Sequence, residues 1–357
     1  MTWPWIALGN LVERADIPYG IVQPGHHERE GVPIVRVKDL TNGSISRSDP
    51  LRVAPAISRK HQRTVLKGGE LLLSIVGSVG EAAVVPASLA GWNVARAIAV
   101  VRPTEVTADW VRYCLQIPSV RDSITSMLNT TVQATLNLSD LKRLEIPVPP
   151  CSARKAIAEV LGALDDKIAA NARLTRSADE LLSVTFQSLL HAGQYVPLSR
   201  LARFVNGRAF TKGATGTGRV VIRIAELNSG IGGSTVYNDL DVVDDHLARP
   251  GDLLFAWSGS LTVHRWFRPE GIVNQHIFKV IPDGVPIWVV KCALDQKLTD
   301  FKAIAADKAT TMGHIQRRHL DEPVLVPDAA AMREHDPAMS ALWQRALLAE
   351  QESLQLA

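Results

Sequence analysis

The residues that could take part in phosphate chemistry lie in one glycine-rich stretch, Gly213 to Arg219. A loop that cradles the phosphates of a nucleotide ends in Gly-Lys-Ser or Gly-Lys-Thr, follows a strand and opens a helix. The stretch here is Gly-Ala-Thr-Gly-Thr-Gly-Arg, which has neither that ending nor that setting. We therefore expect a flexible loop rather than a nucleotide site.

Carboxylates that could hold a metal or move a proton occur in two small groups. Asp165 and Asp166 lie mid-helix beside a lysine, which is typical of a solvated face. Residues 244–246 (Asp-Asp-His) come just before Pro250, where a turn needs such residues. The chain has no His-Glu-x-x-His, no Gly-x-Ser-x-Gly and no Asn-Pro-Pro-aromatic tetrad of the kind that amino-methyltransferases use. The sequence predicts no catalytic residue and no metal site.

Cations suited to nucleic acid recur at equivalent places in the two halves of the chain. Phosphate contacts need Arg or Lys but carry no sequence information. Any single cation could be an ordinary surface residue, and it is the recurrence that favours a DNA-binding set. The candidate cations are Arg36, Lys38, Arg59, Lys60, Arg63, Arg96, Lys142, Arg143, Arg208, Lys212, Arg223, Arg265 and Arg317.

Base edges are recognised by Arg, Lys, Asn, Gln, Ser or Thr side chains that exposed loops present. Asn274 could pair with adenine or could satisfy backbone groups at the start of a strand, and we favour the second. The other candidates lie in loops around Gly77 and Gly259 and in two Thr-Thr stretches. They are Ser74, Ser78, Thr130, Thr131, Gln133, Ser258, Ser260, Thr262, His264, His276, Thr310, Thr311 and His314.

The elements that must position these residues occur twice, at an offset of about 185 residues. Segments match in the same order with similar gaps, which exceeds what chance provides. The matched pairs are 35–43 with 222–230, 69–78 with 251–260, 97–103 with 276–282, and 146–149 with 324–327. The chain is therefore a duplicated unit with a pseudo-two-fold internal repeat.

The first part of each unit has short β-branched runs bounded by Gly, Pro, Asn and Asp. Such runs predict strands of an α+β domain, so that the chain holds two tandem globular domains. The runs are 33–37, 70–76, 95–101, 220–224, 252–257 and 276–281, and short helices are expected at 109–115 and 286–298.

A long helix follows the first domain. Between Ser152 and Leu190, apolar residues alternate steps of four and three, which is a heptad seam. A helix of this length spans about 55 Å. Asn171 on the seam could set the register of a helix pair or could lie at a wet edge. The main seam residues are Ile157, Leu161, Leu164, Ile168, Asn171 and Leu182.

A weaker seam from about Pro337 to Leu356 predicts a second helix. Antiparallel pairing of the two helices as a coiled coil would bury both seams and put the two domains at opposite ends. The predicted organisation is a globular domain at 1–150, a long helix at 151–194, a second globular domain at 195–327 and a distal helix at 328–357.

The composition is that of a globular protein with a mild positive bias. Hydrophobic residues make up 46%, and 39 Lys and Arg against 36 Asp and Glu leave a net charge of +3. This charge is compatible with a polyanionic partner but does not require one. The 3 cysteines are far apart, which predicts reduced thiols rather than disulfides or a zinc site. Without a signal-peptide pattern or an apolar run that could span a bilayer, we expect a soluble cytoplasmic protein with no membrane partner.

Several stretches resemble the DNA-specificity (S) subunit of Type I restriction–modification systems. They are Val-Arg-Val-Lys-Asp-Leu at 35–40, Gly-Glu-Leu-Leu-Leu-Ser at 69–74, residues 136–141 running into Ile-Pro-Val-Pro-Pro, and the helix 157–171, which is similar to that family's central helix. The resemblance covers nearly the whole chain. It implies two target recognition domains that each recognise one half of a bipartite, asymmetric site in double-stranded DNA. It also implies that the helices set the gap and dock two methyltransferase subunits.

The resemblance further implies that this chain is not an enzyme and binds no cofactor. S-adenosylmethionine would bind the methyltransferase subunits, and ATP and Mg would bind the restriction and translocation subunits. In that family the distal helix usually continues through an Arg-Asp-Leu-Leu-Pro-like stretch, whereas this chain stops at Ala357, which puts docking at the distal helix in question. The alternative is a protein-interaction scaffold whose duplicated domains do not themselves recognise DNA.

Overall fold

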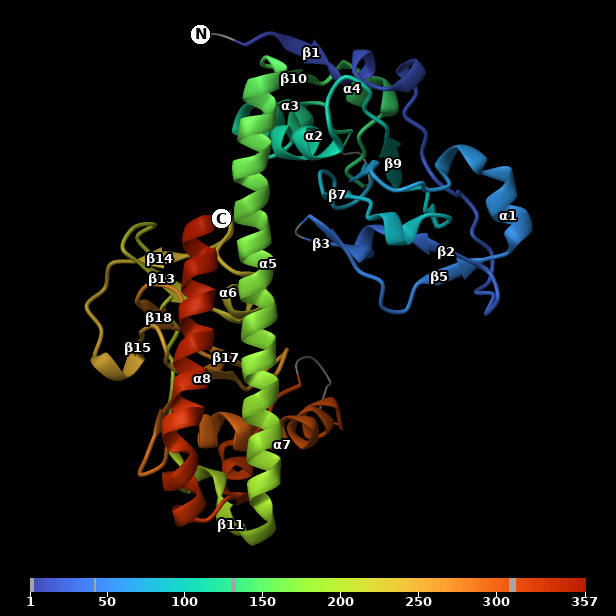
Figure 1. The fold of residues 1–357 in the computed structure, drawn as a ribbon. Helices are drawn as coiled ribbons and strands as arrows, with labels where there is room; N and C mark the ends of the chain where they lie inside the picture. The colour runs from blue at the N-terminus through green and yellow to red at the C-terminus, as the bar shows by residue number, and fades with distance from the viewer. Residues whose placement is uncertain (1–2, 42, 130–132, 308–312) are drawn as a thin grey trace. The chain divides into compact units, whose positions relative to one another are not determined.

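The computed structural model describes residues 3–41, 43–129, 133–307 and 313–357. The chain divides into two compact units, unit 1 (Met1–Gly162) and unit 2 (Ala163–Ala357). The boundary falls inside the long helix α5 (Cys151–Ser188). In Figure 1 unit 1 runs from blue to green and unit 2 from green to red.

Unit 1 is a set of small sheets with short helices. The sheets have the strand orders β5-β2-β8, β7-β6-β9, β3-β4 and β1-β10. The strands are β1 (Trp5–Ala7), β2 (Val32–Val35), β3 (Leu40–Thr41), β4 (Ser44–Ile45), β5 (Leu51–Val53), β6 (Leu71–Ser74), β7 (Ala82–Val84), β8 (Asn93–Val94), β9 (Ile98–Val101) and β10 (Glu145–Pro147). The α-helices are α1 (Pro55–Lys60), α2 (Ala108–Cys114), α3 (Pro118–Ser126) and α4 (Leu138–Arg143).

Strand β6 lies at the centre of the unit 1 core. Because successive side chains of a strand point to opposite faces, Leu71 and Leu73 pack into one cluster with α2 and α3, and Leu72 packs into a second cluster with Val35. All four residues of β6 are buried, which explains why its first three residues are all leucine rather than alternating apolar and polar residues.

Unit 2 repeats this plan with longer strands. Its sheets have the orders β12-β19-β16-β17, β14-β13-β18-β15 and β11-β20. The strands are β11 (Gln194–Pro197), β12 (Ala202–Asn206), β13 (Arg219–Ile222), β14 (Tyr237–Asn238), β15 (Leu247–Ala248), β16 (Leu253–Ala256), β17 (Thr262–Arg265), β18 (Gly271–Val273), β19 (Ile277–Pro282) and β20 (Pro323–Val326). Its helices are the rest of α5 with α6 (Ile224–Ser229), α7 (Ile287–Asp307) and α8 (Ala329–Leu356). The α+β prediction is confirmed, although α7 runs nine residues past the expected 298.

The internal repeat extends to individual backbone hydrogen bonds. The central strands are β6 in unit 1 and β16 in unit 2, which pair with β9 and β19. In each unit, the N–H of the residue after the central strand donates to the residue before that paired strand, and its carbonyl accepts from a later segment. The bonds are Ile75 N to Ala97 O (2.8 Å) and Leu136 N to Ile75 O (2.9 Å) in unit 1, and Trp257 N to His276 O and Ile315 N to Trp257 O (both 3.1 Å) in unit 2. The two units therefore share one loop frame.

A glycine is required at the same place in both units. A Cβ at Gly20 would lie 2.1 Å from the carbonyl oxygen of Val94, and one at Gly207 would lie 2.2 Å from that of Asn274. Only glycine lets two backbone segments approach this closely. The duplicated sequence thus preserves a steric constraint.

An antiparallel strand pair closes each globular part. In unit 1, β1 pairs with β10 in the register Trp5 to Pro147, and in unit 2, β11 pairs with β20 in the register Gln194 to Val326. Each pair brings the two ends of a globular part together next to a long helix.

In unit 2 the C-terminal half of α5 lies antiparallel to α8 (Figure 1). Asn171 donates to Glu352 near the end of α8 at 2.9 Å, whereas Leu182 shares a core with Met339, nearer its start. Asn171 is only 4% exposed, so it makes a buried register contact rather than lying at a wet edge. Ile157, at the other end of the seam, packs against the unit 1 core instead of a second helix.

Helix α8 begins earlier than the seam predicted. Asp328 caps it, since its carboxylate accepts from the backbone N–H groups of Ala330 and Ala331 at 2.9 and 2.8 Å. Pro337, where the sequence placed the start, lies inside the helix. The cap and the packing of Met332 into the core extend the helix past a residue that disfavours it.

Candidate nucleic-acid interface

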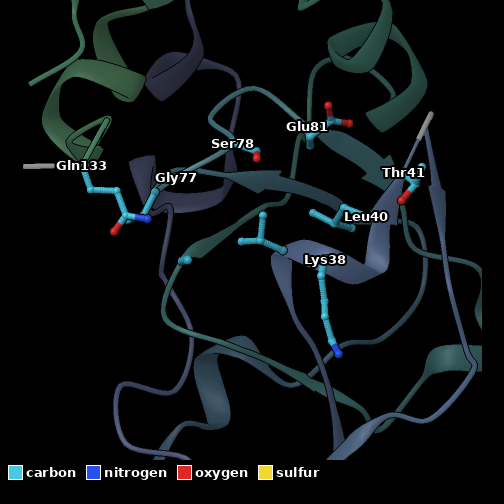
Figure 2. Close-up of a pocket in the computed structure, with 10 residues that line it drawn as sticks. Lys38, Leu40, Thr41, Gly77, Ser78, Glu81 and Gln133 are labelled. Atoms are coloured by element: carbon cyan, nitrogen blue, oxygen red, sulfur yellow. The ribbon is translucent and has the colours of Figure 1, made fainter. Parts of the chain in front are cut away.

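Unit 1 has an open cavity of about 680 Å³ between three segments of the repeated frame (Figure 2). Lys38, Leu40 and Thr41 follow β2, while Gly77, Ser78 and Glu81 come from the loop between β6 and β7. Gln133 completes the wall. Loops held by a rigid frame are the usual carriers of recognition residues, which makes this cavity the first candidate site.

The floor of this cavity is held in place by Gly77. Its φ of +81° suits glycine, and its N–H donates to the carbonyl of Ala134 at 2.9 Å. A Cβ at this position would lie 3.0 Å from Nε2 of Gln133, so the Gln133 amide lies directly over Gly77. Two predicted features, the loop glycine and Gln133, are thus brought together although they are far apart in sequence.

The polar side chains at the rim of this cavity are available to a ligand. Lys38, Thr41, Ser78 and Glu81 are all exposed. Among the residues that the structure describes, the side chains of Lys38 and Glu81 make no hydrogen bond or ion pair. Figure 2 shows these two side chains extending from opposite sides of the cavity. The rim therefore offers both a donor and an acceptor.

A second cavity of unit 1, of about 550 Å³, gathers four of the predicted cations. Arg59, Lys60 and Arg63 lie at the end of α1 and just beyond it, and Lys142 comes from α4. The only carboxylate in its lining, among the described residues, is Asp16, which is paired with Arg63. Because three cations remain without a carboxylate partner in the described part of the chain, this cavity suits a phosphate backbone. We call it the basic cavity.

In unit 2 a smaller cavity of about 230 Å³ lies between α6 and the end of β17. Arg268 contributes its guanidinium, which lies 5.0 Å from the ring centre of Phe267. Burial lowers the pKa of Arg268, and it lowers the pKa of His264 as well. Nε2 of His264 is buried without a hydrogen-bond partner within the described residues. The Arg268 guanidinium is the group of this cavity that would favour an anion.

Two of the predicted DNA contacts, Arg36 and Arg223, instead stabilise turns. Arg36 Nε donates to Asp39 at 2.9 Å and its Nη2 to the carbonyl of Asp49 at 2.8 Å. Arg223 does the same with Glu226 at 3.0 Å and Ser234 at 2.7 Å. The hydrogen bond to Asp39 is the main cause that raises the pKa of Arg36. These two recurring cations hold the same turn in both units, and their role as phosphate contacts stays a prediction.

Arg265 is also a structural residue rather than a DNA contact. Its side chain is 3% exposed and binds Glu350 at 2.8 Å and Asp179 at 3.2 Å. Its guanidinium carbon lies 4.3 Å from the ring centre of Trp343. A cation held by two carboxylates and an aromatic ring cannot also reach a phosphate without breaking this network.

Two predicted serines and a histidine are buried or held within the frame. Ser74 is 0% and Ser258 3% exposed, and the Ser74 hydroxyl accepts from the Glu81 N–H at 2.9 Å. His276 has a φ of +74° and lies 5.3 Å from the ring of Trp257. The serines therefore shape loops from beneath, which corrects their prediction as base contacts.

The remaining predicted residues have varied surroundings. Thr262 donates to Asn228 at 3.4 Å, and Arg143 is paired with Asp140, whose pKa this bond lowers. The Asn274 side chain accepts from the Phe210 N–H at 3.1 Å. It therefore satisfies a backbone group, which is the role favoured above over pairing with adenine. Exposed positions are occupied by Arg96, Arg208, Lys212, Ser260 and Arg317, and His314 is half-buried. Thr130, Thr131, Thr310 and Thr311 lie outside the described residues.

Glu81 is the cavity residue that sequence reasoning missed. DNA contacts were predicted only among cations and neutral polar side chains, which leaves out every carboxylate. A usable signal was present, because Glu81 follows the Gly77 loop and precedes a strand, much as Thr262 follows the Gly259 loop in unit 2.

Two negative findings hold for the described residues. No group of three or more His, Cys, Asp or Glu side chains there is placed to hold a metal ion. Nor does any helix in those segments combine the length and apolarity needed to cross a membrane.

Part of the chain is similar to a known family of protein domains. Residues 23–178 match the model of the Type I restriction modification DNA specificity domain. This stretch of the chain is similar to that family. It contains most of the lining of both cavities of unit 1 and the first part of α5.

Individual proteins are similar to the chain over different extents. The Type I restriction enzyme EcoBI specificity subunit of Escherichia coli is 26% identical over 201 residues, which cover 53% of this chain and 42% of that protein. The match thus spans less than half of the curated relative. The S subunit of a Type I restriction–modification system from M. genitalium shares the fold, with a TM-score of 0.59, 16% identity, and coverage of 100% of this chain and 93% of that one. The HsdS subunit from Thermoanaerobacter tengcongensis gives a TM-score of 0.37 at 14% identity, covering 99% of this chain and 93% of that chain.

Proposed function

We propose that this chain is the DNA specificity subunit of a Type I restriction–modification complex. The observation that carries the proposal is the repeat of one loop frame. Unit 1 holds the specificity domain, and unit 2 reproduces its backbone hydrogen bonds. A frame that occurs twice is what a protein needs to recognise the two halves of a bipartite site.

The two frames present different side chains, as two different half-sites require. Ile75 in unit 1 corresponds to Trp257 in unit 2, and Ala97 corresponds to His276. The exposed Lys38 corresponds to an alanine, Ala225. In the proposed function, unit 1 and unit 2 therefore bind unlike sequences, with the basic cavity contacting the phosphate backbone.

The long helices have a separate role in this proposal. Helix α5, which joins the two units, sets the gap between the half-sites, and α5 and α8 dock two methyltransferase subunits. This chain itself is non-catalytic and binds no cofactor. The methyltransferase subunits bind S-adenosylmethionine, the restriction and translocase subunits bind ATP and Mg, and the complex acts on DNA in the cytoplasm.

Binding of the full chain to duplex DNA at several salt concentrations tests this function. Every cation that neutralises a phosphate adds about 0.9 to the steepness with which log K falls against log salt. Replacing Arg59 and Lys60 together with alanine should therefore flatten that slope by about 2 units. Arg333→Ala, an exposed cation on α8, is the control and should leave the slope unchanged. If the full chain shows no salt-dependent binding to duplex DNA, the protein-interaction scaffold becomes the better explanation.

A further inference from the structure

Glu81 differs from the other acidic residues near the unit 1 frame. Asp39, Asp16 and Glu70 each form an ion pair with an arginine, whereas the Glu81 carboxylate has no cation partner within the described residues. It is nevertheless held at a defined place, because the Glu81 N–H donates to the Ser74 hydroxyl at 2.9 Å. The β6–β7 hairpin thus presents one unpaired carboxylate at the rim of the 680 Å³ cavity (Figure 2).

A carboxylate on a surface that binds DNA must face a hydrogen-bond donor. Against phosphate it would be repelled, and an ionised glutamate can only accept hydrogen bonds. The donors of the major groove are the exocyclic amino groups of cytosine and adenine. Cytosine presents its N4 amino group alone, whereas adenine presents an amino group beside the N7 acceptor. An acceptor-only side chain therefore matches cytosine, and an amide matches adenine.

We propose that Glu81 is a specificity-determining residue and accepts a hydrogen bond from the N4 amino group of a cytosine in the half-site bound by unit 1. The inference rests on the DNA-binding function proposed above and adds the identity of one base. It also explains why the rim of a DNA-binding cavity carries Glu81, a side chain that phosphates would repel.

Unit 2 has a neutral residue at the equivalent position. Leu71 corresponds to Leu253, and the hairpin registers then place Glu81 opposite Ser74 and Thr262 opposite Ala256. The Thr262 hydroxyl donates to Asn228 at 3.4 Å, so it is already engaged within its own unit. Unit 2 therefore lacks, at this position, the acceptor-only carboxylate that selects cytosine in unit 1, which makes the two half-sites differ at this base.

The test uses the full chain and a pool of randomised duplex DNA, with sequencing of the bound fraction. The wild type should enrich cytosine at one position of one half-site by about tenfold over other bases. Glu81→Gln should move the preference at that position from cytosine to adenine, because its amide both donates and accepts. Glu81→Thr, which installs the unit 2 residue, should abolish the cytosine preference. The other half-site should stay as in the wild type and serves as an internal standard for correct folding.

Glu105→Gln is the matched control, since Glu105 is an exposed carboxylate of unit 1 outside the cavity. Glu105→Gln removes the same negative charge, so it should raise the affinity for DNA of any sequence as much as Glu81→Gln does. The DNA motif that Glu105→Gln enriches should remain that of the wild type. An unchanged motif in both Glu81 variants overturns the inference while leaving the proposed function intact. Loss of preference in both half-sites would also overturn it, because the effect would then be structural. A wild type that enriches no sequence refutes the proposed function itself.

Discussion

The network around Arg265 allows a quantitative test of how unit 2 is held to its helices. Arg265 lies on β17, while its partners Asp179 and Glu350 lie on α5 and α8. Replacing Arg265 with methionine keeps most of the packing on Trp343 but leaves two carboxylates close together without a cation. Removing one partner of a buried ion pair typically costs about 3–5 kcal/mol.

The expected loss lies at the lower end of that range because water reaches the carboxylates. Asp179 is 33% and Glu350 20% exposed, whereas Arg265 is 3% exposed. We expect Arg265→Met to lower the free energy of unfolding by about 3 kcal/mol. For a unit of this size, that corresponds to a fall in Tm of about 6–12 °C.

Arg249→Met is the matched control for this prediction. Arg249 also binds two carboxylates, Asp244 and Glu270, but it is 47% exposed. Exposed ion pairs contribute about 0–1 kcal/mol, so its Tm should fall by less than about 4 °C. Differential scanning calorimetry of the full chain measures both variants, and amide hydrogen exchange in β17 and α8 assigns the transition.

The pH dependence gives a second readout with a defined sign. Burial raises the pKa of Glu350, and Arg265 acts in the opposite direction. Without Arg265 the Glu350 pKa should rise further, so that the folded state binds a proton more tightly than the unfolded state. The stability of the Arg265→Met variant relative to the wild type then improves as the pH falls through the raised pKa of Glu350. Equal Tm losses for Arg265→Met and Arg249→Met, or a deficit that widens in acid, would refute the reasoning.

Two further predictions concern close packing and thiol reactivity. Gly207→Ala should destabilise unit 2 by about 2–3 kcal/mol in urea unfolding, because a Cβ would lie 2.2 Å from a backbone oxygen. Gly232→Ala, with no atom within 4 Å of its Cβ, should change stability by less than about 0.5 kcal/mol, and equal effects would contradict the steric argument. Only the exposed Cys151 should react rapidly with a thiol reagent at mildly alkaline pH, since burial raises the pKa of Cys114 and Cys292 to about 12. Rapid labelling of a second thiol in the native chain would show that one of the buried sites is open.

The repeat and most of its elements could be predicted from the sequence because their signals are local. Strand β6 is a short apolar run beside a glycine turn, and α5 has a heptad seam that proline does not interrupt. Each pattern depends on side chains a few residues apart, where spacing reports structure directly. Helix α8 begins at Ala329, beside the predicted boundary at 328, whereas its apolar seam was recognised only from Pro337, because a cap and a core contact carry the helix past that proline.

Only the tertiary structure decided which polar side chains are exposed to a ligand and which are held by other residues of the chain. Arg36 and Lys38 are two residues apart in one matched segment, yet the first holds a turn and the second is exposed. Arg265 finds its carboxylates 85 and 86 residues away, and no local pattern encodes a contact of that separation. Charge alone therefore could not distinguish a structural arginine from a surface cation.

By itself, the sequence determined that the chain contains one structural unit in two copies, with a long helix after each globular part. The tertiary structure determined which residues those two frames expose. Folding brought Gln133 over Gly77, left Glu81 without a cation among the described residues and buried Ser74 beneath the same loop. The physical reason is that hydrogen-bond partners and burial depend on segments distant in the chain, whereas helix and strand patterns depend on neighbours.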